Sequence, residues 1–387
     1  MLKKIDINLN ILILLGLIIL NHIFLLSPGL IFFAEINCLL FIFFSIFYFF
    51  KHKVDKILFF LIVILFIIAL GTPTTGWDAR SIWLLKAKII FYDQSIMNII
   101  NNSPNFSNSS YPVIAPAFAA SFANIVGHWN EIFPKAAFTL MFIPPLILIN
   151  KFIHNNYFLL TIILIFFIIG KYLTNGELDG LVSIYFVSSA IMFYNLKYIN
   201  NESYIYCLIL IFLNIILTLL KVEGSILLIS LIVSSIIIYI NNKKILRNII
   251  FVSLTSFIPV LIWNIFCIYN SSGASNVNNV FTIDNLSARI FILKNYIIIF
   301  DYLILNEKFL LGLLLLILSL IFCKNNKILH FTFYTSFIYI FFLFMIYLST
   351  SLDLEWYLNS ASRVIKPIAL FFSIFSIYNL LNKNKKH

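Results

Sequence analysis

Residues 57–71 read ILFFLIVILFIIALG, and residues 72–88 continue TPTTGWDARSIWLLKAK. The first stretch has no polar side chain, and its length approaches that of a helix that crosses the hydrocarbon core of a bilayer. Because lipid offers the backbone no hydrogen-bond partners, such a run must satisfy its own backbone groups as a helix. The polar stretch follows at once, so Asp78 should lie only a few residues beyond the hydrocarbon edge.

The rest of the chain repeats this pattern. Of its 387 residues, 62% are hydrophobic and 11% are charged, and the mean hydropathy is +1.02. A soluble domain of this length would need far more polar surface, and the apolar runs lack the alternation of a membrane β-barrel. The composition therefore predicts an all-α, polytopic transmembrane bundle that forms a single domain over residues 1–387. The net charge of +11 does not indicate nucleic-acid binding, because the lysines lie in short loops.

About twelve spans are expected, and the charged loops between them predict their orientation. The spans lie near residues 9–26, 30–50, 57–71, 134–150, 157–173, 179–196, 204–220, 224–240, 249–268, 309–323, 328–348 and 364–381. With the N-terminus in the cytoplasm, the inner loops and tails hold 15 of the 26 basic residues and 3 of the 15 acidic ones. This excess of inner basic residues predicts that both termini are cytoplasmic.

Two further apolar stretches are expected to be interfacial or re-entrant helices. Residues 113–127 are short and contain Pro116, and residues 290–305 carry two charges. If both stretches crossed, only residues 128–289 would change sides, and the charge rule hardly separates the two topologies. A basic cluster at 243–247 favours twelve spans. The longest outer segments are then 72–133, 269–308 and 349–363, which predicts a working surface on the outer face.

The first outer segment carries ionisable groups close to the membrane. Arg80 and Lys86 follow Asp78 on an expected interfacial helix with Trp83 among its apolar contacts. A carboxylate and cations at this depth suit a reaction on a phosphate-bearing lipid. An ordinary interfacial turn with an aromatic anchor would have the same sequence features, so this segment alone leaves both interpretations open.

Three later outer turns add charged residues: TNGELDGL (174–181) with Glu177 and Asp179, KVEG (221–224) with Lys221 and Glu223, and SLDLEWYLNSASRVIKP (351–367) with Arg363 and Lys366. Carboxylates can face a cation, a sugar hydroxyl or an arginine, and an arginine can bind phosphate oxygens. Each turn, taken alone, is equally a solvated turn, a local ion pair or a snorkelling anchor. The predicted topology places all of them on one face. The middles of the predicted spans carry no charge, which argues against an ion-coupled carrier.

The order of these motifs resembles a known group. GWDARSIWLLKAK (76–88) followed by YPVIAPAFAA (111–120) resembles the first outer loop of the membrane-embedded C-type glycosyltransferase superfamily. The branch it resembles includes protein O-mannosyltransferases, aminoarabinose transferases and rhizobial lipopolysaccharide sugar transferases. ELDGLVSIYF (177–186), KVEG and SASRVIKPI (360–368) resemble later motifs of that group, so the resemblance runs from about residue 57 to 370. The chain departs from the group where YPVIAP lacks the second adjacent proline and where Trp77 replaces an acidic residue.

The resemblance implies an inverting transfer of a sugar from a polyprenyl-phosphate donor to a hydroxyl on a glycolipid, glycan or protein at the outer face. Asp78 aligns with the catalytic base. The residues implied to bind substrate are Trp77, Arg80, Lys86, Tyr111, Glu177, Asp179, Lys221, Glu223 and Arg363. The implied setting is the bacterial inner membrane, in lipopolysaccharide or glycan biosynthesis for the cell envelope, with membrane lipids as neighbours. The departures from the group's motifs leave a divalent metal ion open as a cofactor.

Two other functions remain open from the sequence. One is a flippase or carrier for lipid-linked glycans, and the other is an O-antigen ligase or polymerase. Ligases of that kind use a large late outer loop with arginine and histidine, whereas the late loop here is short and has no histidine. The six histidines of the chain are scattered without metal-ligand spacing, so no metal-binding residue is predicted.

Overall fold

Helices form the framework of the protein. The computed structural model describes residues 2–52, 56–97, 99, 108, 110–153, 155–198, 203–270, 282–323 and 326–383. The helices, in chain order, are α1 (Leu2–Phe24), α2 (Ile31–Lys51), α3 (Lys56–Gly71), α4 (Leu84–Asp93), α6 (Ile114–Val126), α7 (Phe133–Leu140), α8 (Ile143–Ile153), α9 (Asn155–Ile169), α10 (Asp179–Tyr194), α11 (Ser203–Leu220), α12 (Val222–Tyr239), α13 (Lys243–Tyr269), α14 (Ile283–Ile290), α15 (Leu293–Ile304), α16 (Glu307–Cys323), α17 (Asn326–Ser349), α18 (Leu354–Leu358), α19 (Ala361–Val364) and α20 (Lys366–Lys383). Two short helical segments, η3 (Ala79–Trp83) and η5 (Gly170–Leu173), carry residues of interest below.

The lengths of these helices bear on the expected spans. Among the described residues six helices are long and apolar enough to cross a membrane, or seven if α15 and α16, which are bent by 70°, count as one span. Six further apolar helices are shorter, with 10–17 residues. Large apolar side chains such as Phe50, Phe60 and Leu254 are exposed on the outside of the bundle, where only lipid could cover them. The chain is therefore a helical membrane protein, and helix length supports fewer full crossings than the twelve predicted.

Two predicted stretches gain detail in the structure. The span expected at 134–150 lies within Phe133–Ile153, which is long and apolar enough to cross a membrane, although Met141 and Phe142 separate α7 from α8 inside it. Pro144 and Pro145 stand in the first turn of α8, where their missing N–H groups and fixed φ angles are tolerated and where a continuous helix would be interrupted. The separate helix expected at 290–305 is α15, and a 70° bend sets it apart from α16.

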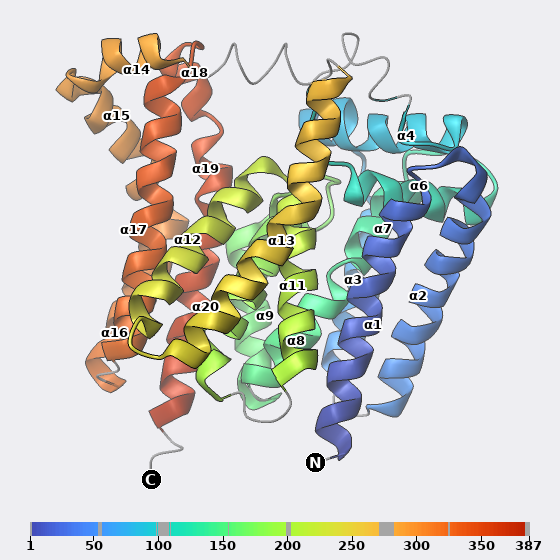
Figure 1. Ribbon diagram of the computed structural model, residues 1–387, viewed down its shortest axis with the longest axis horizontal. Helices are drawn as coiled ribbons and strands as arrows, with labels where there is room; N and C mark the ends of the chain where they lie inside the picture. Colours follow the sequence, from blue (N-terminus) through green and yellow to red (C-terminus); the bar gives the residue numbers. More distant parts are fainter. Residues whose placement is uncertain are drawn as a thin grey trace.

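Helix α6 corresponds to the stretch expected at the membrane surface. Figure 1 shows α4 and α6 lying across one end of the bundle, roughly at right angles to α1 and α2. Protein nevertheless covers most of α6, since nine of its residues, among them Pro116 and Phe118, are buried. Its small alanine and serine side chains allow this close packing, so α6 is a capping helix inside the protein rather than a helix floating on lipid.

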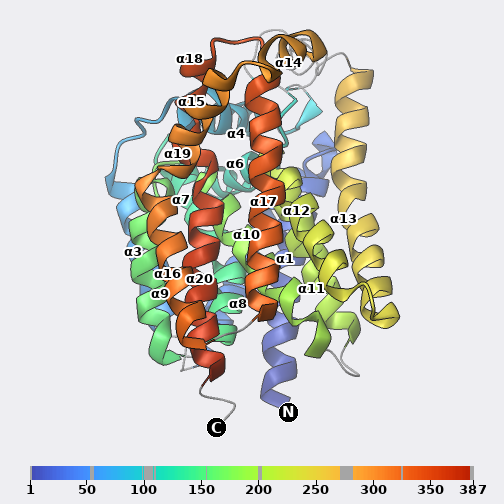
Figure 2. The same ribbon diagram turned by 90° about the vertical axis from the view of Figure 1, so that its left-hand side faces the viewer.

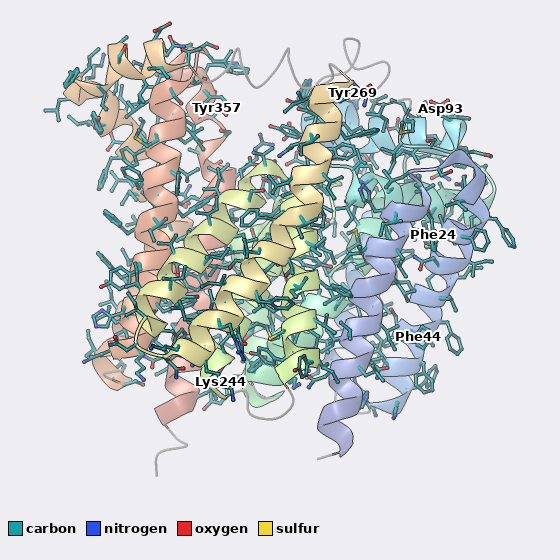
Figure 3. All side chains as sticks on the ribbon, in the orientation of Figure 1. Phe24, Phe44, Asp93, Lys244, Tyr269 and Tyr357 are labelled. Atoms are coloured by element: carbon teal, nitrogen blue, oxygen red, sulfur yellow. The ribbon has the colours of Figure 1, made fainter. Side chains whose placement is uncertain are left out.

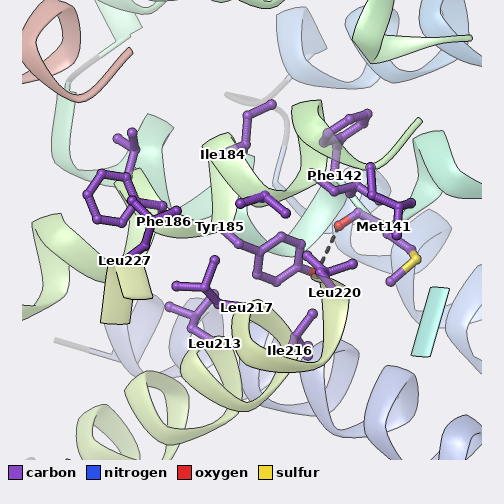
Figure 4. Packing of buried hydrophobic residues seen from close by; sticks show 14 of the residues in the cluster. Met141, Phe142, Ile184, Tyr185, Phe186, Leu213, Ile216, Leu217, Leu220 and Leu227 are labelled. Atoms are coloured by element: carbon purple, nitrogen blue, oxygen red, sulfur yellow. Dashed lines mark hydrogen bonds between the residues drawn. The ribbon is translucent and has the colours of Figure 1, made fainter. Parts of the chain in front are cut away.

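Helix α10 is the centre of the bundle. Every residue from Asp179 to Tyr194 is buried, and the helix packs against α8, α11, α12 and α20. A helix that is apolar on all sides needs such an environment. Figure 4 shows this packing, in which the Tyr185 hydroxyl donates a hydrogen bond of 3.0 Å to the Met141 carbonyl at the α7–α8 break. Because Asp179 is the first residue of α10, the acidic turn before it lies over the centre of the protein.

The two ends of the bundle differ in character. Both termini lie at one end in Figure 1, and Figure 2 shows α4, α14 and α18 together at the other. Figure 3 places Lys244 towards the termini, whereas Asp93, Tyr269 and Tyr357 lie at the opposite end. Helices α13 and α17 have 27 and 24 residues, but the central helices α10, α11 and α12 have only 16, 18 and 18. In both ribbon views α13 and α17 rise past the start of α12, so the turns that begin the central helices lie below the tips of these longer ones.

Candidate functional site

Asp78 and Arg363 meet although 285 positions separate them in the chain. The Arg363 Nη1 donates a hydrogen bond of 2.5 Å to Oδ2 of Asp78, and the two side chains are 24% and 14% exposed. Asp78 precedes the first turn of η3, and Arg363 belongs to the short helix α19. Helix α7 holds the loop before Asp78 in place, because its buried Lys135 donates a hydrogen bond to the Thr72 carbonyl.

Glu177 joins the same cluster from the turn before α10. Its Oε2 lies 3.7 Å from Nη1 of Arg363. A β-carbon added to Gly76 would lie 2.1 Å from Oε1 of Glu177, so the carboxylate packs where any other residue would place a side chain. The glycine before the Trp77–Asp78 pair therefore makes room for Glu177 as well as allowing the turn.

A second ion-pair group lies beside the first. Lys221 Nζ is 3.0 Å from Oδ1 of Asp179 and 3.2 Å from Oε1 of Glu223, and Lys221 and Asp179 are almost wholly buried. Two glycines allow the close approach of these turns. A β-carbon on Gly180 would lie 2.4 Å from the Tyr172 carbonyl oxygen, and one on Gly224 would lie 2.0 Å from that of Leu217.

The two groups form one site, which we call the acidic cluster: Asp78, Glu177, Asp179, Lys221, Glu223 and Arg363. A cavity of about 10 Å³, the room of one water molecule, touches Asp179, Lys221, Glu223 and Arg363. Four carboxylates and two cations meet here, so the cluster carries two net negative charges when all its groups are ionised. Oε2 of Glu177, Oδ2 of Asp179 and Oε2 of Glu223 are buried acceptors without a hydrogen bond from any described residue.

Electrostatics separate the two ion-pair groups. Burial raises the pKa of the Glu177 carboxyl above its ordinary value, the neighbouring carboxylates of Asp179 and Asp78 raise it further, and Arg363 only partly offsets this. Burial acts to lower the pKa of the Lys221 ammonium, but Asp179 and Glu223 outweigh it and hold that pKa well above its usual range. Lys221 is therefore fixed as a cation, whereas the raised pKa of Glu177 makes it protonate more readily than an ordinary glutamate.

Four other predicted residues lie outside the acidic cluster. Trp77 is 62% exposed and Arg80 is also exposed, so neither is held against the carboxylates. The buried Lys86 donates hydrogen bonds to the carbonyls of Asn108 and Tyr111, and burial lowers the pKa of its ammonium to about 7. Lys86 thereby links two parts of the first outer segment, helix α4 and the backbone at residues 108 and 111.

Tyr111 lies between the segment that Lys86 fastens and the acidic cluster. Its ring stacks on Trp83 with 5.9 Å between ring centroids. Burial first, and then the carboxylate of Glu223, raise the pKa of its phenol.

Tyr339 and Lys135 were not predicted as site residues. Tyr339 of α17 touches the small cavity and donates a hydrogen bond of 2.8 Å to the Val364 carbonyl, next to Arg363. It stands in the middle of an apolar run without a motif, so no local signal distinguishes it from other tyrosines. Lys135 opens a predicted span, where a lysine looks like a snorkelling anchor.

No described group of three or more histidine, cysteine, aspartate or glutamate side chains is placed to hold a metal ion. The carboxylates of the acidic cluster instead face Lys221 and Arg363. Comparison of the chain with protein-family models, with curated proteins and with solved structures finds no match.

Proposed function

We propose that this protein is a membrane-embedded glycosyltransferase of the C-type superfamily. It transfers a sugar, with inversion, from a polyprenyl-phosphate donor to an acceptor hydroxyl on a glycolipid, glycan or protein. In this proposal the chain crosses a bacterial inner membrane about twelve times, with both termini in the cytoplasm and the acidic cluster on the outer face. The short apolar helices then cross where the bilayer is locally thinned or where neighbouring helices cover their ends.

The observation that carries the proposal is the composition of the acidic cluster. Four separate turns, which share the motif order of that superfamily, contribute its six residues, and Asp78 touches Arg363 directly. Three buried carboxylate oxygens in the cluster have no donor among the described residues. Such orphaned acceptors are rare and costly in a folded protein. The hydroxyl groups of a sugar are donors of the kind that would satisfy them.

Asp78 is suited to the role of general base. Its hydrogen bond to Arg363 uses Oδ2, and its other oxygen makes no hydrogen bond to a described residue. That second oxygen can accept the proton of the acceptor hydroxyl while Arg363 holds the carboxylate in place. The departing lipid phosphate needs no strong acid, since cations near its oxygens stabilise the developing charge. A base on one side and a leaving group on the other give inversion at the sugar carbon.

The test is transfer of a radiolabelled sugar from a polyprenyl-phosphate donor in proteoliposomes. Asp78→Asn keeps the size of the side chain but cannot take the proton, and loss of a general base costs roughly 10²–10⁴ in rate. Asp93→Asn is the matched control, because Asp93 is an exposed carboxylate at the end of α4 in the same outer segment. Equal transfer by Asp78→Asn and wild type would remove the catalytic assignment. Movement of the labelled donor across the vesicle wall without transfer would establish a carrier instead.

A further inference from the structure

Two lysines lie over the ring of Tyr172, beside the acidic cluster, and a third adjoins one of them. Lys366 Nζ lies 4.7 Å from the centre of the Tyr172 ring, and Lys171 Nζ lies 5.5 Å from it. Lys308 is in direct polar contact with Lys366. They come from three elements: η5 after α9, the first turn of α16 and the first residue of α20. We call this group the lysine cluster.

The lysine cluster has no described acid in direct contact with it, although the charges of Glu177 and Asp179 reach Lys171 and Lys366. No described carboxylate lies within the 4.0 Å of an ion pair from any of the three ammonium groups. The Lys366 side chain is buried, with only 4% of it exposed. It donates a hydrogen bond of 2.9 Å to the Ile168 carbonyl. Two like charges in contact at the edge of a membrane are unfavourable unless an anion lies between them.

The helix directions strengthen this argument. Lys308 and Lys366 stand in the first turns of α16 and α20, which pack closely, since a β-carbon on Gly312 would lie 2.5 Å from the Ala369 carbonyl oxygen. Cations are disfavoured at the start of a helix, where backbone N–H groups already present positive charge. Two paired helix starts, each with a lysine, therefore concentrate positive potential at one place.

The neighbouring acidic cluster offers a resting phosphate less unshared positive charge. Its two cations, Lys221 and Arg363, are each shared by two carboxylates. A phosphate there would meet net negative charge, whereas at the lysine cluster it would meet three ammonium groups, of whose N–H donors one is already given to the Ile168 carbonyl. Phosphate is the common anion that matches several separate ammonium groups.

The surface beside the lysine cluster is apolar and faces outward. Helix α20 packs against both α9 and α16. On these two helices the exposed side chains include Ile163 and Phe167 of α9 and Leu314 and Ile321 of α16, between 53% and 63% exposed. Chains of a lipid can cover these faces while its phosphate reaches the lysines at their outer end.

We propose that Lys171, Lys308 and Lys366 bind the phosphate of a membrane lipid whose hydrocarbon chains lie along α9 and α16. The site is separate from the acidic cluster, and it stands whether or not the protein transfers a sugar. Lys308 is half-buried and Lys171 is exposed, so an entering headgroup reaches both, and Lys366 lies at the bottom of the site.

Binding of monododecyl phosphate to the full-length protein in an uncharged detergent tests this site, with dodecanol and inorganic phosphate as separate probes. Calorimetry and the thermal midpoint both report binding without donor or acceptor present. We expect dodecyl phosphate to bind and to raise the midpoint, dodecanol to do neither, and inorganic phosphate to bind at least about tenfold more weakly. Each of Lys308→Gln and Lys171→Gln should weaken dodecyl phosphate binding by about tenfold, the scale of one charge-assisted hydrogen bond.

Lys294→Gln is the control, because Lys294 is an exposed lysine of α15 outside the lysine cluster, and its binding should equal that of wild type. Wild-type affinity in both Lys308→Gln and Lys171→Gln would overturn the site. Equal affinity for inorganic and dodecyl phosphate would overturn its assignment to a lipid. Because no sugar transfer is measured, loss of the proposed function would leave these outcomes unchanged.

Discussion

Arg363 is the residue whose role changes most between sequence and structure. The motif around it predicts a cation for phosphate oxygens, but its guanidinium faces Asp78 and Glu177. A cation held by two carboxylates is already neutralised, so its main effect is on them. It fixes the orientation of Asp78 and counteracts the rise in the pKa of Glu177 that burial causes.

We therefore expect Arg363→Ala to destabilise the protein in a pH-dependent way. Its removal leaves partly buried carboxylates facing one another, which should cost about 1–3 kcal/mol near neutral pH, less than breaking a fully buried pair. The pKa of Glu177, already raised, rises further. A carboxyl with a raised pKa in the folded state favours folding below the unfolded value near 4.5 and loses that contribution as pH rises through the folded value.

The thermal midpoint of Arg363→Ala should accordingly lie closest to that of wild type near pH 4.5 and fall behind as pH increases. Arg289→Ala is the control. Arg289 donates its hydrogen bonds to the carbonyls of Thr350 and Leu352, which do not titrate, so its deficit should not vary with pH in that range. A constant deficit for Arg363→Ala would show that the carboxylates do not depend on its charge. Arg363→Lys should restore part of the stability, because it keeps the charge but loses the planar fork.

Local spacing explains which predicted residues meet and which do not. Asp78 and Arg80 are two positions apart at the start of a helical segment, and side chains at that spacing point to opposite sides. The structure accordingly leaves Arg80 exposed while Asp78 contacts Arg363. The lysine cluster could not be predicted in this way. Its members are isolated in the sequence, and only the packing of α9 and α16 on α20 brings them together.

At the scale of elements, glycines decide how closely the turns of the acidic cluster approach. Gly76 faces the tip of the Glu177 side chain, which can move, whereas Gly224 faces the Leu217 backbone, which cannot. The same substitution should therefore act differently at the two positions. Gly224→Ala forces α11 and α12 apart and should cost about 1–3 kcal/mol, as other overpacked sites do.

Gly76→Ala should leave stability nearly unchanged and reduce sugar transfer in the proteoliposome assay. The new methyl group would displace the Glu177 carboxylate from its place beside Arg363, and the loop has room to keep its path. Gly71→Ala is a close control, because Gly71 ends α3 five residues earlier and a β-carbon there meets nothing within 4 Å. Full transfer by Gly76→Ala, with a normal melting temperature, would mean that the position of Glu177 does not matter to the reaction.

The helix breaks show what apolar runs cannot predict. Hydropathy alone joins α7 and α8 into one expected span, although Pro144 and Pro145 are visible in the sequence. Proline limits where a helix can begin, yet Phe133–Ile153 remains long and apolar enough to count as one span, with the Tyr185 hydroxyl bonded to the Met141 carbonyl at the break. The bend between α15 and α16 has no proline at all, so its 70° angle follows from tertiary packing.

For the whole molecule, the arrangement of the ends agrees with the side assignments drawn from charge. Lys244 lies towards both termini, and α4, α14 and α18 lie at the opposite end. Of the 26 basic residues, the 11 assigned to the outer side include all those in the acidic and lysine clusters. In the proposed orientation these residues go against the rule that orients membrane proteins, and their concentration beside one group of carboxylates is the reason we propose a function at that end.

The side assignment itself can be measured by cysteine labelling with a membrane-impermeant maleimide, applied to cells before and after the membrane is opened. Lys171 and Lys244 are both exposed, and they belong to the stretch 128–289 that changes sides if α6 and α15 are full crossings. With the native cysteines replaced by serine, Lys171→Cys should be labelled in intact cells and Lys244→Cys only after opening. Thr75→Cys, exposed and three residues before Asp78, is the reference, because it lies before that stretch and should label from outside in either topology.

Labelling of Lys244→Cys but not Lys171→Cys in intact cells would place Glu177 and Asp78 on opposite sides of the membrane. The contact of both side chains with Arg363 in the structure forbids that arrangement, so this result would refute the fold as well as the topology.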